Sequence, residues 1–306
     1  MKKYLPLLLL PGLLVACGKS FLDINTDPNN PTAADLSLTL PAAQVGYVSA
    51  LLRNVNSATG ALVDQVHSPT WGRYLQANND FSNDWRGLYA DAFQDLEVVI
   101  EATKTSQKGY SGIAKLQKAY LYAVLVDLWG EVPFGEALKN RTPKFDDGKT
   151  VYDAVFKLID EALADLDGKN GAVGTVPATA DAIYRGNLTK WVKMGNSLKL
   201  RLYNQTRLTD PAAAEAGIKT LLQTPAKLIT STDDDFQFQF GTGIAPQNAH
   251  PLWIQNYTAS TKSGYLANHL FWKLLNADHP LLRPAVRYKA QDPRLRYYVF
   301  RQVASQ

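Results

Sequence analysis

Residues 119–138, AYLYAVLVDLWGEVPFGEAL, constrain the fold of this chain more than any other stretch. Up to Trp129 the stretch is almost entirely apolar and aromatic, which predicts a helix that is buried on all sides. Gly130 is the residue type that most often ends a helix in a left-handed conformation. Pro133 cannot continue a helix and biases Val132 toward an extended conformation. A buried helix with such a stop belongs at the centre of a helical stack, so we assign this stretch to structure rather than to ligand binding.

Helical periodicity recurs through most of the chain, with apolar residues at three- and four-residue spacing. The predicted helices cover residues 37–55, 59–66, 85–103, 111–129, 150–166, 188–207, 211–223 and 264–276. The alternation FQFQF at residues 236–240 is the only clear strand pattern. We therefore predict an all-α, mostly helical fold with irregular loops and minor β structure. Tetratricopeptide-like scaffolds use helix pairs of this length, although the sequence shows no strict period.

Several polar residues stand where helix caps are expected. Asp84 precedes the helix predicted from residue 85, and Asn187 precedes the helix predicted from residue 188. Thr150 and Asp153 have the spacing of a capping pair at the start of another helix. Asp210 precedes a proline, which fits the first turn of a helix. These residues are expected to fix the helix boundaries.

The charge of the chain argues against a nucleic-acid partner. The 32 Lys and Arg residues and 28 Asp and Glu residues give a formal net charge of +4, and two of the positive charges are Lys2 and Lys3. Without Lys2 and Lys3, the positive and negative charges are too nearly equal in number to indicate a nucleic-acid-binding surface. Cys17 is the single cysteine, so one chain cannot form an internal disulfide or a cysteine-based zinc site.

The N-terminus has the pattern of an exported lipoprotein. Lys2 and Lys3 precede the apolar residues 4–13, which are too few to span a bilayer and are typical of a signal peptide. The tetrapeptide LVAC, which ends at Cys17, resembles a bacterial lipobox, whose cysteine receives a diacylglycerol and becomes the first mature residue. We predict a lipoprotein signal peptide at residues 1–16, lipidation of Cys17 and an N-terminal tether at residues 17–36. The alternative is an ordinary secretory signal with an incidental cysteine.

The sequence shows no clear motif for a metal, a cofactor or catalysis. Asp23, Asn25 and Asp27 have the spacing that opens a calcium loop, but Pro28 occupies the required glycine position and Ala34 the closing glutamate position. The four histidines lack metal-ligand spacing, and nucleophile-elbow and Walker sequences are absent. The motifs therefore predict no metal and no cofactor. A catalytic pair of carboxylates for glycoside hydrolysis is kept as an alternative, because the distance between two such groups in the folded protein does not follow from the sequence.

Six segments, in this order along the chain, together resemble the SusD/RagB family of outer-membrane nutrient-binding lipoproteins from Bacteroidetes. They are LVAC ending at Cys17, FLDINTDPNNP at residues 21–31, DLWGEVPFGEAL at 127–138, VYDAVFKLIDEALADL at 151–166, IYRGNLTKWVKMGNSLKLRL at 183–202 and DPRLRYY at 292–298. The resemblance covers essentially the whole chain and is closest to the SusD-like subgroup. It rests on the set of segments, because no single motif is decisive.

This resemblance implies a fold, a role and a partner. The fold would be a tetratricopeptide-like helical scaffold, here residues 37–306, with loops that carry the binding site. The role would be non-catalytic capture of oligosaccharides or related nutrients at the surface of the outer membrane, through a lipid anchor. The partner would be a SusC-like TonB-dependent transporter. Family members are usually longer after the DPRL-type turn, so we expect residues 37–306 to lack the C-terminal part of the domain.

Sugar binding requires flat apolar platforms and a few polar groups that meet hydroxyls. Residues 67–85 offer both, and the resemblance places loops after the first helices on the ligand face. The first candidates for ligand binding are Trp71, Arg73, Tyr74, Asn79, Asp80 and Trp85. A second group, in a loop-like stretch, is Trp253, Gln255, Asn256 and Tyr257. The alternative is that these aromatic residues fill the core. Trp129, Trp191 and Trp272 lie on helical stripes and are assigned to packing.

Two further functions compete with nutrient binding. A surface-anchored glycoside hydrolase would use the anchor, the aromatic residues and two carboxylates that face each other across a cleft. A helical-repeat scaffold that binds another protein would instead expose a large apolar face without an aromatic pocket.

Overall fold

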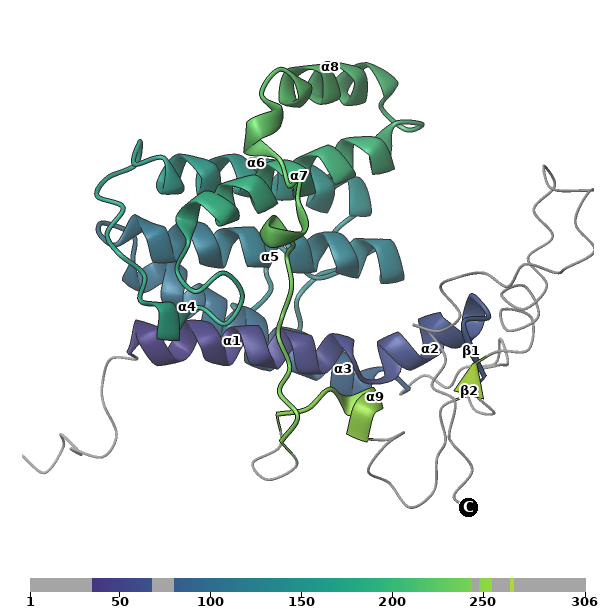
Figure 1. The fold of residues 1–306 in the computed structure, drawn as a ribbon. Coiled ribbons are helices and arrows are strands. Elements are labelled where there is room, and N and C mark those ends of the chain that lie inside the picture. The colour runs from purple at the N-terminus through teal and green to yellow at the C-terminus, as the bar shows by residue number, and fades with distance from the viewer. Residues whose placement is uncertain (1–34, 68–79, 244–247, 255–264, 267–306) are drawn as a thin grey trace, which may run out of the picture.

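The computed structural model describes residues 35–67, 80–243, 248–254 and 265–266 (Figure 1). The predicted signal peptide, the lipidation site at Cys17 and nearly all of the predicted tether lie outside the described residues.

The described part of the chain is mostly helical, as predicted. The elements in chain order are α1 (Leu36–Leu51), α2 (Asn54–Leu62), β1 (Val66–His67), α3 (Ser82–Arg86), the π-helix η4 (Gly87–Phe93), α4 (Gln94–Ala102), α5 (Lys108–Trp129), α6 (Gly148–Leu166), the 3₁₀ turn η5 (Ala178–Ala180), α7 (Leu188–Thr206), α8 (Pro211–Leu222), the 3₁₀ turns η6 (Pro225–Lys227) and η7 (Thr232–Asp234), α9 (Pro251–Trp253) and β2 (Tyr265–Leu266).

Helix α5 is the centre of the helical stack. It packs against α6, α4, α7 and α1, and Figure 1 shows α1 and α4 below it, α6 and α7 above it, and α8 outermost. Most of its residues are buried, because its sequence is apolar or small on nearly every side. The helix ends at Trp129, and Gly130 follows with a φ of 76°. The predicted buried helix and its glycine stop are therefore confirmed.

Two glycines allow the helices around α5 to approach one another closely. A Cβ atom on Gly112 of α5 would lie 2.6 Å from Leu166 Cγ of α6. A Cβ atom on Gly195 of α7 would lie 2.9 Å from Leu116 Cδ2 of α5. Such distances are shorter than van der Waals contact, so α5 can meet both neighbours at this spacing only where the side chain is a single hydrogen.

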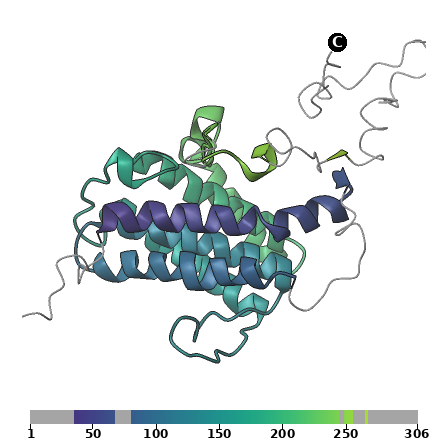
Figure 2. The ribbon, with the colours of Figure 1, turned by 90° about the horizontal axis from the view of Figure 1, so that it is seen from below.

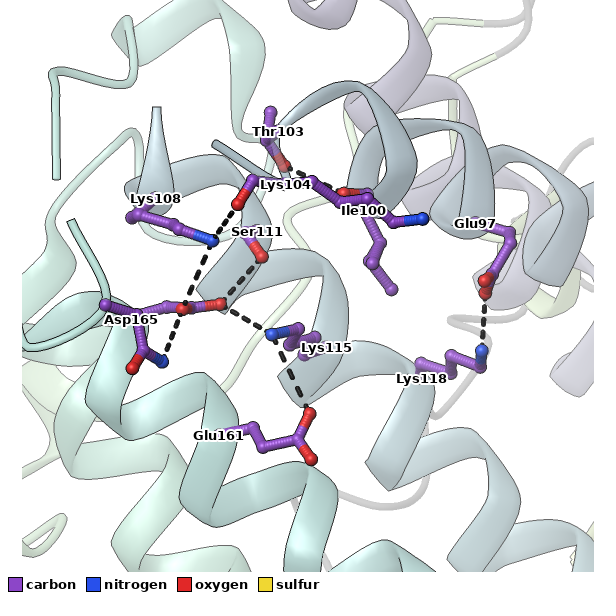
Figure 3. A network of polar contacts seen from close by, with 11 residues as sticks. Glu97, Ile100, Thr103, Lys104, Lys108, Ser111, Lys115, Lys118, Glu161 and Asp165 are labelled. Carbon is purple, nitrogen blue, oxygen red and sulfur yellow. Dashed lines mark hydrogen bonds and ion pairs between the residues drawn. The ribbon is translucent and has the colours of Figure 1, made fainter. Parts of the chain in front are cut away.

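A buried carboxylate fastens the end of α6 to the start of α5 (Figure 3). Asp165 accepts hydrogen bonds from Ser111 Oγ at 2.7 Å, Lys115 Nζ at 2.8 Å and Asn170 Nδ2 at 2.8 Å, and Lys108 Nζ lies 3.7 Å from it. Burial acts to raise the pKa of Asp165, but the hydrogen bonds and the charge of Lys115 outweigh it and hold the pKa below its usual value. The carboxylate is therefore charged and satisfied inside the scaffold.

The helix predicted at residues 85–103 forms, but it starts earlier and is not uniform. The helical run begins at Ser82 and passes through η4, a π-helix, before it continues as α4. Gly87, the first residue of η4, lies so close to α1 that a Cβ atom would be 3.1 Å from Ala50 Cβ. Hydrophobic periodicity at this length does not distinguish a π-helical insertion from an α-helix, so the sequence did not predict it.

The predicted caps at Asn187 and Asp210 are confirmed, whereas the predicted cap at Asp84 is wrong. Asn187 and Asp210 accept hydrogen bonds from the backbone of the first turns of α7 and α8. Asp84 lies inside α3, and its Oδ1 accepts from the backbone nitrogen of Val55 at 3.4 Å. It thus helps the start of α2, where Arg53 provides no side-chain cap. Helix α2 accordingly covers Asn54–Leu62 rather than the predicted residues 59–66.

The capping pair predicted at Thr150 and Asp153 is also wrong. Helix α6 starts two residues before Thr150, and its cap is Asp147, whose carboxylate accepts from the backbone nitrogen of Thr150 at 3.2 Å. Asp153 instead forms an exposed ion pair with Lys149 at 2.7 Å. Asp147 fills the cap position better, because its side chain already lies at the first free backbone donors of the helix.

The strand predicted at residues 236–240 does not form, although its alternation is real. These residues belong to no helix or strand, but the phenylalanines are half-buried and the glutamines are exposed. Phe236 packs against Trp191 and Tyr120, with ring centroids 5.8 and 5.5 Å apart. A segment that lies on a helical surface and buries every second side chain produces the same period as a strand.

The β structure of the described residues is one short antiparallel strand pair and two isolated bridges, Val132 with Asp146 and Gly241 with Ala249. Val66 lies opposite Leu266 and His67 opposite Tyr265, which agrees with the prediction of minor β structure. The prediction of a helix at residues 264–276 is therefore wrong at Tyr265–Leu266, and its other residues lie outside the described part. None of the described helices combines the length and the apolar character that crossing a membrane requires.

Candidate functional site

Three of the predicted ligand-binding residues lie in the described part of the chain. Asp80 and Trp85 stand at the start of the α3 run, and Trp253 ends α9. The predicted residues outside the described part are Trp71, Arg73, Tyr74, Asn79, Gln255, Asn256 and Tyr257. Trp272, which the helical stripe assigns to packing, also lies outside it.

Trp85 belongs to a cluster of aromatic side chains that we call the aromatic platform: Phe81, Trp85, Tyr89, Trp129 and Phe145. The rings of Trp85 and Trp129 meet edge to face with centroids 5.4 Å apart, and Phe81 meets Trp129 at 6.1 Å. Tyr89 lies 4.9 Å from Trp85. Phe145 is nearly parallel to Trp85, with centroids 6.3 Å apart, and exposes 61% of its surface. The platform is therefore continuous and open to solvent at Phe145.

Three separate segments build the platform. Phe81, Trp85 and Tyr89 follow one another at four-residue spacing along α3 and η4, so one side of this helical run carries all three rings. Trp129 is the last residue of α5, where the helix emerges from the core. Phe145 comes from the loop between α5 and α6. The glycine stop of α5 thus leaves Trp129 at the edge of the scaffold, beside Trp85.

The loop that carries Phe145 is held in place by the next residue. The carboxylate of Asp146 accepts from the backbone nitrogens of Phe134 at 2.9 Å and Gly135 at 2.8 Å. The backbones of Asp146 and Val132 also form a pair of hydrogen bonds, at 2.9 and 3.2 Å. These bonds connect the residue after Phe145 to the segment that follows α5. Phe145 can therefore keep its position while exposed, without packing in the core.

Tyr89 links the platform to the same loop. Its hydroxyl donates to the carbonyl oxygen of Pro133 at 2.8 Å. Burial raises the pKa of the Tyr89 hydroxyl well above its ordinary value, and the nearby charge of Asp146 adds to this shift. The hydroxyl therefore keeps its proton and its role as a donor throughout the physiological pH range.

The start of α3 is also held in place by α2. Asn54 Nδ2 of α2 donates to the backbone oxygen of Asp80 at 2.6 Å. Together with the contact between Asp84 and Val55, this bond ties the first turn of α3 to the start of α2. The platform is therefore supported on one side by α2 and on the other by the loop at Asp146.

Trp253, the described member of the second predicted group, stands at the end of α9. Figure 2 shows α9, in yellow-green, on one side of α1 and the blue run of α3, η4 and α4 on the other side. Helix α9 is capped by His250, whose Nδ1 accepts from the backbone nitrogen of Leu252 at 3.1 Å. Burial lowers the pKa of His250. Helix α9 and the α3–η4 run therefore lie on different sides of α1.

Of the five platform residues, only Trp85 is among the predicted ligand-binding residues, and Phe81, Tyr89, Trp129 and Phe145 are missed. The helical stripe assigns Trp129 to packing and no pattern singles out Phe145, yet both lie against Trp85. The four-residue spacing from Phe81 to Trp85 to Tyr89 is a signal in the sequence for a shared face. The assignment of Trp191 to packing is confirmed, because it is fully buried and its Nε1 donates to Asp181.

The surroundings of the platform hold both aromatic rings and polar groups. Within the part of the chain that the structure describes, no three His, Cys, Asp or Glu side chains gather as they would around a metal ion. A shallow hollow of about 220 Å³ between α6 and α7 shares no residue with the platform, and its charged rim comes from Asp160, Asp167, Lys169 and Lys227. Flat aromatic faces beside backbone and side-chain polar groups suit a ligand with both apolar faces and hydroxyls.

The fold and the platform define a class: a helical scaffold with a partly exposed aromatic cluster at its edge. A sequence profile of the SusD-like family, described as starch-binding and associating with the outer membrane, matches residues 28–303. The chain belongs to the SusD-like family. A search of curated protein sequences found no significant match.

Solved structures with this fold share little sequence with the chain. A Bacteroidetes SusD-like protein has a TM-score of 0.66 and 23% identity over 85% of this chain and 50% of its own. A SusD homologue from Bacteroides uniformis has a TM-score of 0.62 and 22% identity over 75% of this chain and 49% of its own. A chitin-binding SusD homologue from Flavobacterium johnsoniae has a TM-score of 0.60 and 17% identity, over 73% and 48%. The chain thus spans about half the length of these structures.

Proposed function

We propose that this protein binds oligosaccharides or related nutrients at the aromatic platform, and that it does so without catalysis. The observation that carries the proposal is the convergence of Trp85, Trp129 and Phe145 from three segments, with Phe145 largely exposed on a fixed loop. The C–H faces of pyranose rings pack well on such aromatic faces. Membership of a family described as starch-binding, and the likeness to a chitin-binding homologue, support a sugar as the ligand.

The cellular role completes the proposal. Residues 1–16 act as a lipoprotein signal peptide, and lipidated Cys17 anchors the protein to the outer membrane through a tether at residues 17–36. The helical domain that follows, residues 37–306 here, faces the outside of the cell. It delivers the bound nutrient to a SusC-like TonB-dependent transporter. The family description supports the outer-membrane location, and the LVAC sequence at Cys17 supports the anchor.

Isothermal titration of the purified protein against soluble oligosaccharides tests ligand binding. The panel contains malto-, cello- and chito-oligosaccharides, which differ in linkage and in the substituent at the second carbon. We expect saturable binding of at least one series, with affinity that rises with chain length as more sugar rings reach the platform. Binding of none of the three series would contradict a neutral glycan as the ligand.

A second assay separates binding from hydrolysis. The protein is incubated with the best ligand and the release of reducing ends is measured over a day. We expect no release above the rate without protein. Steady release that depends on protein concentration would instead favour the surface-anchored glycoside hydrolase.

A further inference from the structure

The π-helix η4 packs two small residues against α1. A Cβ atom on Gly87 would lie 3.1 Å from Ala50 Cβ, and a Cβ atom on Gly46, one turn earlier in α1, would lie 4.0 Å from Ala92 Cβ. Gly46 and Ala50 are four residues apart, whereas Gly87 and Ala92 are five residues apart. One turn of α1 therefore faces a turn of η4 that contains one residue more.

The five-residue spacing can face a single partner because η4 is a π-helix. In an α-helix each residue turns the chain by about 100°, so residues five apart would point in directions about 140° apart. A π-helix bonds each residue to the fifth along the chain, so its turn contains an extra residue. Arg86 and Gln94, which flank η4, both have right-handed helical backbone angles. Helix η4 is thus an insertion in a continuous helical run from Ser82 to Ala102.

The insertion also keeps the aromatic residues of this run in contact. The ring of Tyr89 lies 4.9 Å from that of Trp85 and 5.2 Å from that of Phe93. Four-residue steps in an α-helix drift by about 40° each, since 3.6 residues complete a turn. A π-helical turn is longer, so it opposes this drift. Tyr89 can therefore face the platform while its neighbours Leu88 and Ala92 are buried.

We propose that the inserted residue of η4 positions the ligand site. The insertion directs Tyr89 toward the loop after α5, where its hydroxyl donates to the carbonyl oxygen of Pro133 at 2.8 Å. This bond holds the loop, and Phe145 on it, at the spacing from Trp85 that the ligand requires. Tyr89 is thus a positioning residue. This inference rests on the proposed function, and π-helical insertions of this kind are frequent at functional sites.

Deletion of one residue from η4 tests the insertion itself. Ala90 and Asp91 are both exposed, so either can be removed without the loss of a core side chain. Each deletion leaves Gly87 and Ala92 four residues apart, so an uninterrupted α-helix can still pack on α1. The controls are Ala90→Ser and Asp91→Asn, which change the same positions and keep the length. All proteins are full-length and are titrated with malto-, cello- and chito-oligosaccharides.

We expect both deletions to reduce glycan affinity at least about tenfold, because more than one aromatic contact with the sugar is lost. The two deletions should have equal effects, since the number of residues matters and their identity does not. The two controls should bind as the wild type does. In unbound protein labelled with 5-fluorotryptophan, both deletions should shift the fluorine resonance of Trp85 and leave that of Trp191 in place.

Tyr89→Phe tests the same positioning without a change in chain length. It keeps the ring against Trp85 and removes only the hydrogen bond to Pro133. Tyr184→Phe is the matched control, because the Tyr184 hydroxyl also donates to a backbone carbonyl oxygen at 2.8 Å, that of Asp234, away from the platform. We expect similar decreases in thermal midpoint from both substitutions. Only Tyr89→Phe should lower glycan affinity, by roughly threefold to fivefold.

Three results would overturn the inference. The first is glycan binding by the deletion variants as tight as that of the wild type, and the second is an equal loss of affinity in Ala90→Ser. The third is equal glycan affinity of Tyr89→Phe and Tyr184→Phe, which decides the matter if the deletion variants do not fold. Failure of the proposed function is a different result, because the wild type itself would then bind none of the three series.

Discussion

Phe145 exposes 61% of its surface and lies parallel to Trp85 on a loop that Asp146 fixes. Because it is so exposed, its ring contributes little to the folded core. We expect Phe145→Ala to change the free energy of unfolding by less than about 0.5 kcal/mol. Glycan affinity should fall by roughly fivefold to tenfold, since one aromatic contact contributes about 1 kcal/mol. Urea unfolding and isothermal titration measure the two quantities.

The control for this substitution is Phe238→Ala. Phe238 is a half-buried phenylalanine that pairs with Phe240, with ring centroids 5.0 Å apart, and is not part of the platform. The Phe238→Ala substitution should leave glycan affinity unchanged. If Phe145→Ala and Phe238→Ala bound glycan equally well, Phe145 would have no role in the site.

Asp165 is a fully buried residue whose charge contributes to stability. Its folded pKa lies below the usual value, so it stabilises the fold above the pKa of the unfolded carboxyl, about 3.9, and this contribution is lost as the pH falls through the folded pKa. We expect Asp165→Asn to reduce the free energy of unfolding by about 3 kcal/mol at pH 7, because Lys108 and Lys115 lose their buried partner. The difference in the free energy of unfolding between Asp165→Asn and the wild type should become smaller at acidic pH.

Urea unfolding at pH 7 and near pH 3 measures this difference. Asp153→Asn is the matched control, because Asp153 pairs with Lys149 at an exposed site and should contribute less than about 0.5 kcal/mol at either pH. A difference between Asp165→Asn and the wild type that stays the same at both pH values would show that the charge of Asp165 is not what stabilises the junction.

At the scale of elements, the end of α5 decides where the platform forms. Gly130 adopts φ 76° and ψ −93°, a combination that costs a non-glycine residue about 1–3 kcal/mol. No atom lies within 4 Å of the position that a Cβ atom would take there, so Gly130→Ala tests the backbone alone. We expect Gly130→Ala to lower the free energy of unfolding, measured in urea, by about 1–3 kcal/mol and to change glycan affinity little.

Gly135→Ala is the control in the same loop. Its backbone has no positive φ, and its added Cβ would lie 3.8 Å from Asp146 Oδ2, an ordinary contact. It should change stability by less than about 0.5 kcal/mol. Unchanged stability of Gly130→Ala together with lost glycan binding would mean that this glycine serves the site directly and not the fold.

The elements that could be predicted from the sequence are those set by local patterns. The apolar run of α5 and its stop at Gly130 depend on neighbouring residues, as do the caps at Asn187 and Asp210. Asp84 could not be assigned in this way, because its carboxylate bonds to Val55, which is 29 residues away. The alternation at residues 236–240 correctly indicated one buried side, but the surface beneath it is helical.

The platform could be predicted only in part for the same reason. Trp85 stands out because it lies in an aromatic and polar stretch that precedes a helix. Trp129 and Phe145 reach it only through the folded positions of α5 and of the loop tied by Asp146. Their sequence distance from Trp85 hides this convergence, since no local period connects them.

At the scale of the whole molecule, the proposed ligand site and the polar junction that stabilises the scaffold are separate. The platform combines the α3–η4 run with the end of α5 and its loop, whereas Asp165 joins the end of α6 to the start of α5. Substitutions can therefore separate glycan affinity from stability.

Fluorine NMR of protein labelled with 5-fluorotryptophan tests most directly whether the aromatic platform is the ligand site. The chain has six tryptophans, and their resonances can be assigned by replacing each in turn with phenylalanine. We expect the bound oligosaccharide to shift the resonances of Trp85 and Trp129 and to leave that of Trp191, which is fully buried, in place. A shift of Trp253 with Trp85 and Trp129 unmoved would contradict the platform as the site.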